Sequence, residues 1–517
     1  MNIDTARIQH IQQQLGEIRQ RKTEAFGAES HDFTLKPPVL PATLEMFEAR
    51  QQVRLPAEYR AFLLAVGNGG AGQAYGLYSL EQSGTGGVLS RPSPLHPGMP
   101  QQGDWAEVLG LDEDSEAFYD GALTLLTQGC TYDVLLMVAG PYRGQIVYVD
   151  WNMEHAPYFS QFPDFLTWYE TWLHETLNGY NMTGFGYGLP LTSEESVLVA
   201  ADPREPTVRR EAALNNLLRA PSLSADFLPA LKADLMSEPN VALSTEFLLA
   251  LARHGGDGLE EISWSILRKA QGSQIFRTVQ AMQTLGMPDW TEAALWALEQ
   301  DTDKDASESI LFMLKREKAA SPRAIELAFA SQHAVTTGLY VNSELNEPLS
   351  VPDAFFSHPD PRVRRYSVEY QTREALQPKL SLLIKMYQQE ESDHVRQGWA
   401  LKLGSFDEPS VTAALIQLLQ NERSPIAQSA LINKLGERKV RYAVPLLIQL
   451  AGHEDGVLRL EAANALGEIG DERARPVLKA LLSQKEHPFR FEEDGGGMGY
   501  AYSISQAARK ALDALDG

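Results

Sequence analysis

The stretch LPAEYRAFLLAVGNGG, residues 55–70, indicates the fold of the N-terminal third of the chain. Pro56 suits the first turn of a helix, because a backbone N–H at that position would have no helical partner anyway. Tyr59, Phe62 and Leu63 then fall on one face at helical spacing. The closing GNGG predicts a sharp end, since glycine and asparagine tolerate the left-handed backbone conformation. We therefore expect an amphipathic helix that packs on a core and stops abruptly.

Elements on both sides of this helix complete an α+β pattern. One face of a predicted N-terminal helix is formed by Ile8, Ile11, Leu15 and Ile18. Apolar runs at 123–126, 134–139 and 145–150 predict strands, and the GPYRG turn between the last two predicts a hairpin. A short strand is also predicted over 76–80, and helical spacing returns over 162–173. These elements predict an antiparallel sheet flanked by helices.

The order of these segments resembles the SMI1/KNR4 family of the SUKH superfamily. The resemblance is carried by LPAEYRAFLLAVGNGG, YGLYSL, LLMVAGPYRGQIVYVDW and FPDFLTWYETWL. It implies an α+β domain over residues 30–182, preceded by a leader helix within residues 1–29. It also implies a binding role without catalysis, because members of that superfamily are mostly bacterial immunity proteins that bind and block co-encoded toxins. Fungal relatives act as regulatory scaffolds.

From about residue 190 the sequence becomes nearly continuous helix with an internal repeat. The segments HVRQGWALKLG, IAQSALINKLG and LRLEAANALG end at Gly404, Gly436 and Gly467, which gives a period of about 31 residues. A second landmark, in AALIQLL, VPLLIQL and RPVLKALL, recurs with the same period. Since two landmarks agree, the sequence predicts an all-α, HEAT-like solenoid over 190–517, with a loop insertion at about 485–499.

Each repeat of this kind buries its apolar face only against its neighbours, so we expect a right-handed solenoid with a long concave surface. The pattern resembles HEAT repeats of the short, phycobilin-lyase-like type. Such repeats commonly link adjacent turns by ladders of charged hydrogen bonds. We expect this structural role for the pairs Asp360 with Arg364, Asp393 with Arg396, and Asp455 with Arg459.

Composition narrows the range of partners and compartments. The 517 residues include 68 acidic and 45 basic ones, and the net charge of −23 repels nucleic-acid phosphates and attracts a basic protein surface. The single cysteine, Cys130, excludes an intrachain disulfide and a Cys-based zinc site, and its apolar context predicts a buried thiol. No export signal or membrane-spanning run is visible. We expect a cytoplasmic protein with no nucleic-acid or membrane partner.

Two groups of side chains are candidates for contact with a protein partner. Clustered carboxylates can mimic phosphates and occupy the basic cleft of a nuclease, although such runs are more often solvated loops. The acidic candidates are Asp112, Glu113, Asp114, Glu116 and Asp120. Amphipathic rings beside turns can anchor an interface, although about half of them are expected to close the core instead. The aromatic candidates are Tyr75, Tyr78, Tyr142, Trp151 and Tyr158.

The sequence contains no pattern that predicts catalysis or metal binding. The run GTGG at residues 84–87 lacks the Gly-Lys-Ser/Thr ending of a phosphate loop. His174 and Glu175 lack the second histidine of a zinc protease, and no Gly-x-Ser-x-Gly elbow occurs. We therefore expect no catalytic residue, no metal and no cofactor.

Three hypotheses for function remain open at this stage. The first is an immunity protein that binds and neutralises a cognate toxin, with nucleases among the candidate toxins. The second is an intracellular scaffold or regulatory adaptor that uses the solenoid, because the repeat array offers more surface than one inhibitor needs. The third is a lyase or chaperone of phycobilin-lyase type, which depends on the repeat type alone and gives the N-terminal domain no place.

Overall fold

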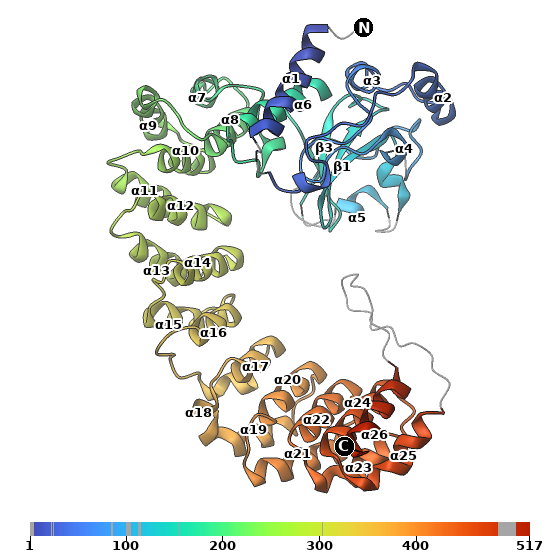
Figure 1. Ribbon diagram of the computed structural model, residues 1–517. Helices are drawn as coiled ribbons and strands as arrows, with labels where there is room; N and C mark the ends of the chain where they lie inside the picture. Colours follow the sequence, from blue (N-terminus) through green and yellow to red (C-terminus); the bar gives the residue numbers. More distant parts are fainter. Residues whose placement is uncertain are drawn as a thin grey trace. The chain divides into compact units, whose positions relative to one another are not determined.

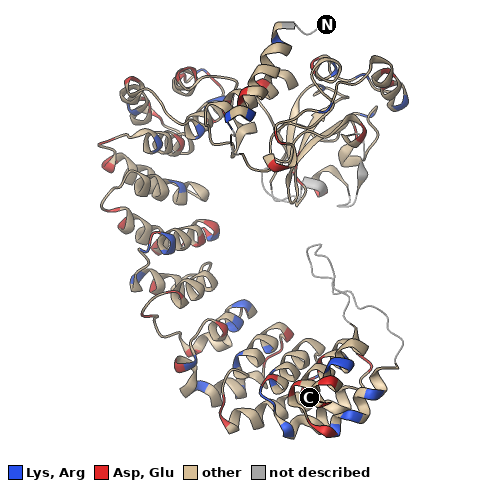
Figure 2. Ribbon diagram, in the orientation of Figure 1, with Lys and Arg blue, Asp and Glu red and all other residues tan. Residues whose placement is uncertain are grey.

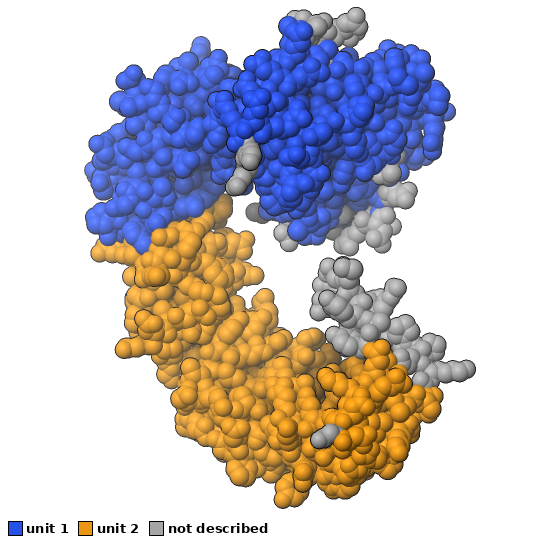
Figure 3. Space-filling model, viewed as in Figure 1, with its two compact units in different colours: residues 1–270, 277–290 blue, residues 271–276, 291–517 orange. Residues whose placement is uncertain are grey.

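A computed structural model shows two compact units (Figure 3). It describes residues 5–21, 23, 25–83, 86–99, 105–111, 115–152, 155–301, 303–483 and 503–516. The first unit contains residues 1–270 and 277–290, and the second contains 271–276 and 291–517. The predicted insertion at about 485–499 lies outside the described residues. The domain ranges 1–29, 30–182 and 190–517 stay predictions.

A four-stranded antiparallel sheet in the order β1-β2-β3-β4 lies at the centre of the N-terminal α+β part (Figure 1). Its strands are β1 (Ala122–Gly129), β2 (Tyr132–Met137), β3 (Ile146–Asp150) and β4 (Tyr158–Phe159). The predicted hairpin is confirmed as β2 and β3, in a register that pairs Val134 with Tyr148. Asp133 and Asp150 are the only charged residues in these strands, which are almost wholly tan in Figure 2. This composition follows from burial of both faces of the sheet.

Helices cover one face of the sheet, and they include the three predicted from the sequence. These are α1 (Thr5–Arg21), α3 (Ala57–Ala65) and α6 (Phe165–Leu177). The rings of Tyr59 and Phe62 each meet Phe165 edge to face, with centroids 4.8 and 5.1 Å apart. Asp164 begins α6, because its carboxylate accepts the Thr167 N–H. The N-terminal fold class, an antiparallel sheet flanked by helices, is thereby confirmed.

The opposite face of the sheet is covered by the segment that precedes β1. Its core is formed by Leu95, Met99, Phe118, Ala122, Leu135, Met137, Val147, Val149 and Phe159. The remaining helices before β1 are η1 (Ala28–Ser30), α2 (Pro41–Gln51), α4 (Leu80–Ser83), α5 (Trp105–Leu109) and η2 (Glu116–Tyr119), and Leu44 of α2 and Leu80 of α4 belong to the core on the first face. The sheet therefore lies between two apolar cores.

The prediction of a strand over residues 76–80 is wrong. Leu77 forms only an isolated bridge with Gly70, and Leu80 already begins α4. Gly76 has a φ of 88°, so the backbone departs from extended geometry at the first residue of the segment. The Tyr78 N–H still donates to the Leu125 carbonyl of β1, at 2.7 Å. The segment therefore covers the edge of β1 without joining the sheet as a strand.

Helices continue after α6 in the first unit. They are η3 (Phe185–Tyr187), α7 (Ser193–Ala201), α8 (Thr207–Arg219), η4 (Ala225–Phe227), α9 (Leu228–Ser237), α10 (Val241–His254) and α11 (Glu260–Leu267), and the chain then enters α12 (Ser273–Thr284). The side chain of Thr192 and that of Glu195 form a reciprocal capping box that begins α7. Helix α8 packs between α7 and α10.

The second unit is an α-solenoid with two layers of helices. One layer, here called the inner layer, contains α14 (Lys304–Arg316), α16 (Val335–Ser343), α17 (Pro361–Glu369), α20 (Asp393–Leu403), α22 (Pro425–Glu437), α24 (Gly456–Ile469) and α26 (Ile504–Asp516). The other contains α13 (Trp290–Gln300), α15 (Pro322–Ala330), α18 (Arg373–Leu376), α19 (Leu380–Tyr387), α21 (Pro409–Asn421), α23 (Val444–Leu450) and α25 (Arg475–Leu481). Short 3₁₀ turns join them at η5 (Asp353–Ser357), η6 (Gln377–Lys379), η7 (Arg441–Ala443) and η8 (Glu472–Ala474). This architecture confirms the predicted HEAT-like solenoid.

Repeated glycines let the inner helices approach one another closely. A Cβ atom on Gly436 would lie 2.7 Å from Ala465 of α24, and one on Gly467 would lie 2.7 Å from Ala511 of α26. These glycines stand one repeat apart in the sequence, so they recur at one position of the repeat. Because the inner helices pack more closely than the outer ones, the array curves toward the inner layer (Figure 1).

A ladder of charged hydrogen bonds links successive repeats, and its acidic partners include Glu390 and Glu422, neither of which was predicted from the sequence. Arg364 pairs through two 2.7 Å contacts with Glu390 of the next repeat, and Arg396 pairs with Glu422 at 2.9 Å. The predicted partner Asp393 also pairs with Arg396, at 2.5 Å. Asp360 instead pairs with Arg362, and Asp455 accepts backbone N–H groups at the start of α24.

Candidate functional site

Four side chains converge at the end of the sheet that carries the β1–β2 turn. We call Tyr78, Tyr119, Asp133 and Trp151 the Asp133 cluster. Asp133 faces the same side of the sheet as Val149, and Trp151 lies just beyond the end of β3. The Trp151 Nε1–H donates to Asp133 Oδ2 at 2.9 Å, and the Tyr119 ring lies 4.7 Å from the Trp151 ring. An otherwise apolar face of the sheet therefore ends in a carboxylate ringed by aromatic side chains.

The electrostatics of the Asp133 cluster follow from partial burial. Burial raises the pKa of Asp133, and hydrogen bonds from Trp151 and Thr127 oppose this effect only in part. The pKa of Tyr119 rises to about 12, first because of burial and then because of the Asp133 charge. Burial and Asp133 also raise the pKa of Tyr78. Both tyrosine hydroxyls therefore stay protonated at neutral pH and can donate hydrogen bonds to a partner.

A second group of rings surrounds the same turn on the opposite side of the sheet. We call it the turn patch: Phe26, Tyr75, Tyr132 and Tyr187 are 69, 39, 40 and 43% exposed. Phe26 and Tyr75 meet with ring centroids 5.4 Å apart, and Tyr75 lies against Gly129, which pairs with Tyr132. The Tyr187 ring lies 5.7 Å from the ring of Tyr148 in β3, and Tyr148 pairs with Val134, two residues after Tyr132. Exposed aromatic rings of this kind commonly dominate binding energy at protein interfaces.

The prediction of a buried thiol at Cys130 is wrong. Cys130 is exposed and has a φ of 50° in the tight turn between β1 and β2. The turn projects from the end of the sheet, so its apolar neighbours in sequence do not enclose the sulfur. This places a thiol beside the turn patch.

The aromatic candidates from the sequence fall into three places. Tyr78 and Trp151 meet in the Asp133 cluster, and Tyr75 belongs to the turn patch. Tyr158 packs beside Tyr187 with ring centroids 4.3 Å apart. Tyr142 lies at the other end of the sheet, in the β2–β3 turn, where its ring packs against Phe159. A direct role for each in binding stays a prediction.

The acidic candidates are separated from one another. Asp112, Glu113 and Asp114 lie outside the described residues, and Glu116 begins the short helix η2. Asp120 is buried, its carboxylate accepts the Val88 N–H at 2.5 Å, and Arg91 lies 3.6 Å away. Asp120 therefore has partners within the chain, and its contact with another protein stays a prediction.

Sequence reasoning missed five of the eight residues that form these two sites. Asp133 carried a usable signal, because it is a charged residue inside a strand that is otherwise apolar after its first position. Tyr119, Phe26 and Tyr187 carried none, since their positions depend on loops that fold back onto the sheet. Tyr132 directly follows the turn, as an interface residue on a hairpin often does.

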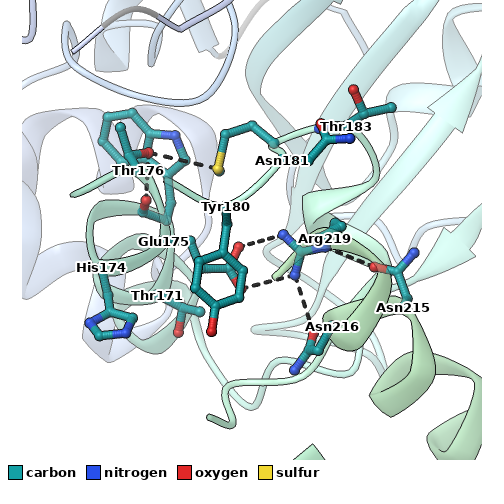
Figure 4. Close-up of polar contacts among 12 residues, drawn as sticks. Thr171, His174, Glu175, Thr176, Tyr180, Asn181, Thr183, Asn215, Asn216 and Arg219 are labelled. Atoms are coloured by element: carbon teal, nitrogen blue, oxygen red, sulfur yellow. Dashed lines mark hydrogen bonds and ion pairs between the residues drawn. The ribbon is translucent and has the colours of Figure 1, made fainter. Parts of the chain in front are cut away.

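A buried ion pair attaches the helices after residue 190 to the α+β part. Arg219 of α8 donates two hydrogen bonds to the Glu175 carboxylate of α6, at 2.5 and 2.9 Å. Figure 4 shows this ion pair. Both side chains are only 3% exposed. Arg219 also donates to Asn215 and Asn216, and the Asn216 amide donates to the Leu189 carbonyl at 2.8 Å. The first unit is therefore continuous across this junction, which fixes the sheet relative to the following helices.

The described residues show neither a metal-binding cluster nor a membrane-spanning helix. No group of three or more His, Cys, Asp or Glu side chains among them is placed to hold a metal ion. No helix in the part of the chain that the structure describes is long and apolar enough to cross a bilayer.

Comparisons with known protein families agree with this architecture. The model of the SMI1/KNR4 family (SUKH-1) matches residues 38–170, and that of HEAT repeats matches residues 412–492. A solved structure of the YibA protein from Escherichia coli is 16% identical, covers 63% of this chain and 93% of its own, and has a TM-score of 0.26. No curated protein sequence matches the chain. The chain therefore carries an SMI1/KNR4 (SUKH-1) domain near its N-terminus and HEAT repeats near its C-terminus, both of which are modules of protein interaction.

Proposed function

We propose that this chain is a cytoplasmic immunity protein whose SMI1/KNR4 domain binds a cognate toxin and blocks it. The observation that carries the proposal is the turn patch, where four exposed rings surround one turn of the domain. Aromatic side chains of this kind bury a large area at a small entropic cost when a partner covers them. The function requires no bond-making step by the chain itself.

The charge of the chain favours a toxin with a basic surface. A net charge of −23 steers a positively charged partner toward the protein and accelerates its association. Nucleases expose such surfaces, because they bind phosphates. We infer that Asp112, Glu113 and Asp114 act in this step, since carboxylates can occupy the positions of phosphates in a basic cleft.

Protection of cells tests this function directly. The full chain would be co-expressed with toxin domains encoded beside its gene, and survival and co-elution of the complex would be measured. We expect protection against one of them. Replacing Phe26, Tyr75 and Tyr132 by alanine should weaken binding by at least about 100-fold, because two or more hot-spot residues are lost. Tyr442→Ala is the matched control, since Tyr442 is 88% exposed on the second unit.

Two outcomes would contradict the proposal. One is a chain that protects against none of the neighbouring toxins and co-purifies with no toxin domain. The other is a triple variant that folds normally and still protects fully. Asp112→Asn, Glu113→Gln and Asp114→Asn, combined, separate the nuclease hypothesis from the general one, since only a nuclease-directed inhibitor should depend on those charges.

A scaffold function is the second candidate, and the HEAT repeats favour it. They supply a surface that is separate from the SMI1/KNR4 domain and belongs to another compact unit. For a scaffold, deletion of the gene would alter normal physiology in cells that contain no toxin. For an immunity protein, deletion would have no effect until the toxin is present.

A further inference from the structure

The inner layer of the second unit presents the same helix positions in four successive repeats. Val363, Val395, Ala427 and Leu458 occupy one buried position, each a single repeat after the last. Three positions further on stand Tyr366, Gly398, Ala430 and Glu461. Six positions further on stand Glu369, Leu401, Asn433 and Asn464. The repeat is therefore regular in its core, whereas its other positions change from Tyr366 and Glu369 at one end to Glu461 and Asn464 at the other.

One end of this surface carries what we call the aromatic ladder, formed by Phe312, Tyr340, Tyr366 and Tyr370. Neighbouring rings along the ladder have centroids 6.1, 5.7 and 5.2 Å apart, and they come from α14, α16 and α17 and the residue after α17. Phe312 is 49% exposed and the three tyrosines are half-buried. The hydroxyls of Tyr366 and Tyr370 have no hydrogen-bond partner among the described residues.

The two cations beside the aromatic ladder, Lys315 and Arg365, are paired with carboxylates of the same chain. Lys315 lies 4.1 Å from the centre of the Tyr340 ring and 3.6 Å from Glu344. Arg365 lies over Tyr366 at 5.9 Å and pairs with Glu369 at 2.7 Å. Because each cation already has an anionic partner, the ladder attracts apolar side chains more than charged ones.

The other end of the inner surface contains an acidic groove. Its volume is about 360 Å³, and α22, α24 and α26 line it with Asn433, Glu461, Asn464, Glu468, Lys510 and small residues. Asn433, Glu461 and Asn464 have no hydrogen-bond partner among the described residues. Asn433 and Asn464 are separated by one repeat and so occupy the same position on adjacent helices. An amide side chain offers both a donor and an acceptor, which matches a peptide unit.

Charge in the acidic groove is only partly balanced. Burial and Glu468 raise the pKa of Glu461. Burial and Glu437 raise the pKa of Glu468, and Lys510, Lys439 and Lys434 reduce that effect without forming an ion pair with it. A basic side chain entering the groove would relieve this repulsion, because it would supply the missing opposite charge.

The distance between the two ends sets the kind of ligand that can use both. Packed helices lie about 8–10 Å apart, so three steps from α17 to α24 span roughly 27 Å. An extended chain advances about 3.3 Å per residue, so eight or nine residues cover this distance. A single small molecule cannot reach both ends, whereas a peptide segment can.

We propose that the inner layer of the second unit binds an extended segment of a partner protein, with apolar side chains on the aromatic ladder and a lysine or arginine in the acidic groove. Asn433 and Asn464, which line the acidic groove, hold the peptide backbone there. The inference rests on the proposed protein-binding function, but it concerns a different unit from the turn patch and does not require a toxin.

Binding of defined peptides to the full-length chain tests the proposal. The probe is a fluorescein-labelled peptide of about 12 residues. One half has Leu and Tyr at alternate positions, and the other half has Lys and Arg at alternate positions. Two versions are made, one with the apolar half first and one with the basic half first. We expect a Kd of about 10–100 μM for one order by fluorescence anisotropy. Tyr366→Ala with Tyr370→Ala should raise that Kd at least about 10-fold.

The acidic groove is tested with Glu461→Gln and Glu468→Gln. The double variant should raise the Kd about 5-fold and flatten its dependence on salt, because screened charge attraction is lost. Tyr442→Ala and Glu454→Gln are matched controls that remove an exposed ring and an exposed carboxylate elsewhere in the unit. Each variant must keep its melting temperature within about 2 °C of the parent chain, so that lost binding is not lost folding.

Three results would overturn the inference. The first is that neither version of the peptide binds. The second is that Tyr442→Ala weakens binding as much as Tyr366→Ala with Tyr370→Ala. The third is that affinity stays unchanged when Lys and Arg of the peptide are replaced by Glu. The effect of Phe26→Ala with Tyr75→Ala separates this inference from the proposed function. These changes should weaken toxin binding and leave peptide affinity unchanged, so either property can fail without the other.

Discussion

The Glu175–Arg219 pair and the arginine–glutamate ladder hold buried charge in different ways, although the first unit also contains one pair of ladder-like spacing, Arg210 with Glu238 at 2.5 Å. In the first unit, Arg219 and Glu175 form one isolated pair between residues 44 positions apart, and both are only 3% exposed. In the second unit, Arg364 with Glu390 and Arg396 with Glu422 form a ladder that repeats with the helices. The junction between α6 and α8 therefore depends on this one ion pair. The ladder divides its stabilisation between two rungs in successive repeats, so each rung matters less.

Removal of Glu175 should give the largest effect and confine it to the first unit. Glu175→Ala leaves the Arg219 guanidinium buried without its carboxylate, which typically costs about 3–5 kcal/mol. Hydrogen exchange measured by mass spectrometry should show faster exchange in α6 and α8. Exchange in α20 and α22 should not change, because those helices belong to the other unit.

A matched control separates burial from the mere loss of an ion pair. Asp202 and Arg204 form an exposed pair in the same unit, with Arg204 88% exposed. Asp202→Ala should leave stability nearly unchanged, because exposed pairs are screened by solvent and salt. If it costs as much as Glu175→Ala, the contrast between the isolated pair and other pairs is wrong.

The same contrast explains how much could be predicted from the sequence. The ladder arginines at 364 and 396 were identified because the repeat places them at equivalent positions, although Glu390 and Glu422 were not named as their partners. The Glu175–Arg219 pair was missed, since no period relates an isolated pair of residues so far apart. The sheet and its helices were predicted from apolar spacing. The turn patch was not, because Phe26 and Tyr187 reach it through irregular loops.

Breaking one rung of the ladder should cost less than breaking the isolated pair. Glu390→Ala should destabilise the second unit by about 2 kcal/mol, the value of hydrogen bonds to a charged group. Burial raises the pKa of Glu390, but hydrogen bonds from Arg364 and Ser392 outweigh it and lower the pKa overall. Because the pKa of Glu390 is lower in the folded chain, the ion pair stabilises the fold at pH values above the unfolded pKa of about 4.3. This stabilisation is lost as the pH falls through the folded pKa.

Urea unfolding at two pH values measures this rung. The free energy of unfolding of Glu390→Ala should be lower than that of the parent chain by about 2 kcal/mol at neutral pH. This difference should become smaller below about pH 4. A difference that grows on acidification would contradict the sign argued above. Trp399 is a suitable fluorescent probe in the same unit, because its indole N–H donates to the Arg364 carbonyl at 3.0 Å.

One repeat lacks the charged rung, and restoring it should stabilise the second unit. Gln428 and His453 stand where the two preceding repeats have arginine and glutamate. The backbone around them is unchanged, since Gln428 donates to the Glu422 carbonyl and His453 accepts the Asp455 N–H. Gln428→Arg with His453→Glu should therefore raise stability by about 1 kcal/mol, and each single change should lower it. Additive single effects would mean that no rung forms.

The smallest effect is expected at Asp133, and it has the opposite dependence on pH from the ladder. Burial raises the pKa of Asp133, so the folded chain binds more protons than the unfolded chain between about pH 3.9 and the raised value. Stability therefore falls as pH rises through this window. Asp133→Asn keeps an acceptor for the Trp151 N–H and removes the titration, so it should be more stable than the parent chain at pH 7 by about 0.5 kcal/mol and equal to it near pH 3.5. Thermal melts at both pH values measure the difference. A constant difference would show that the carboxylate is solvated, and the Asp133 cluster would then be open to water before any partner arrives.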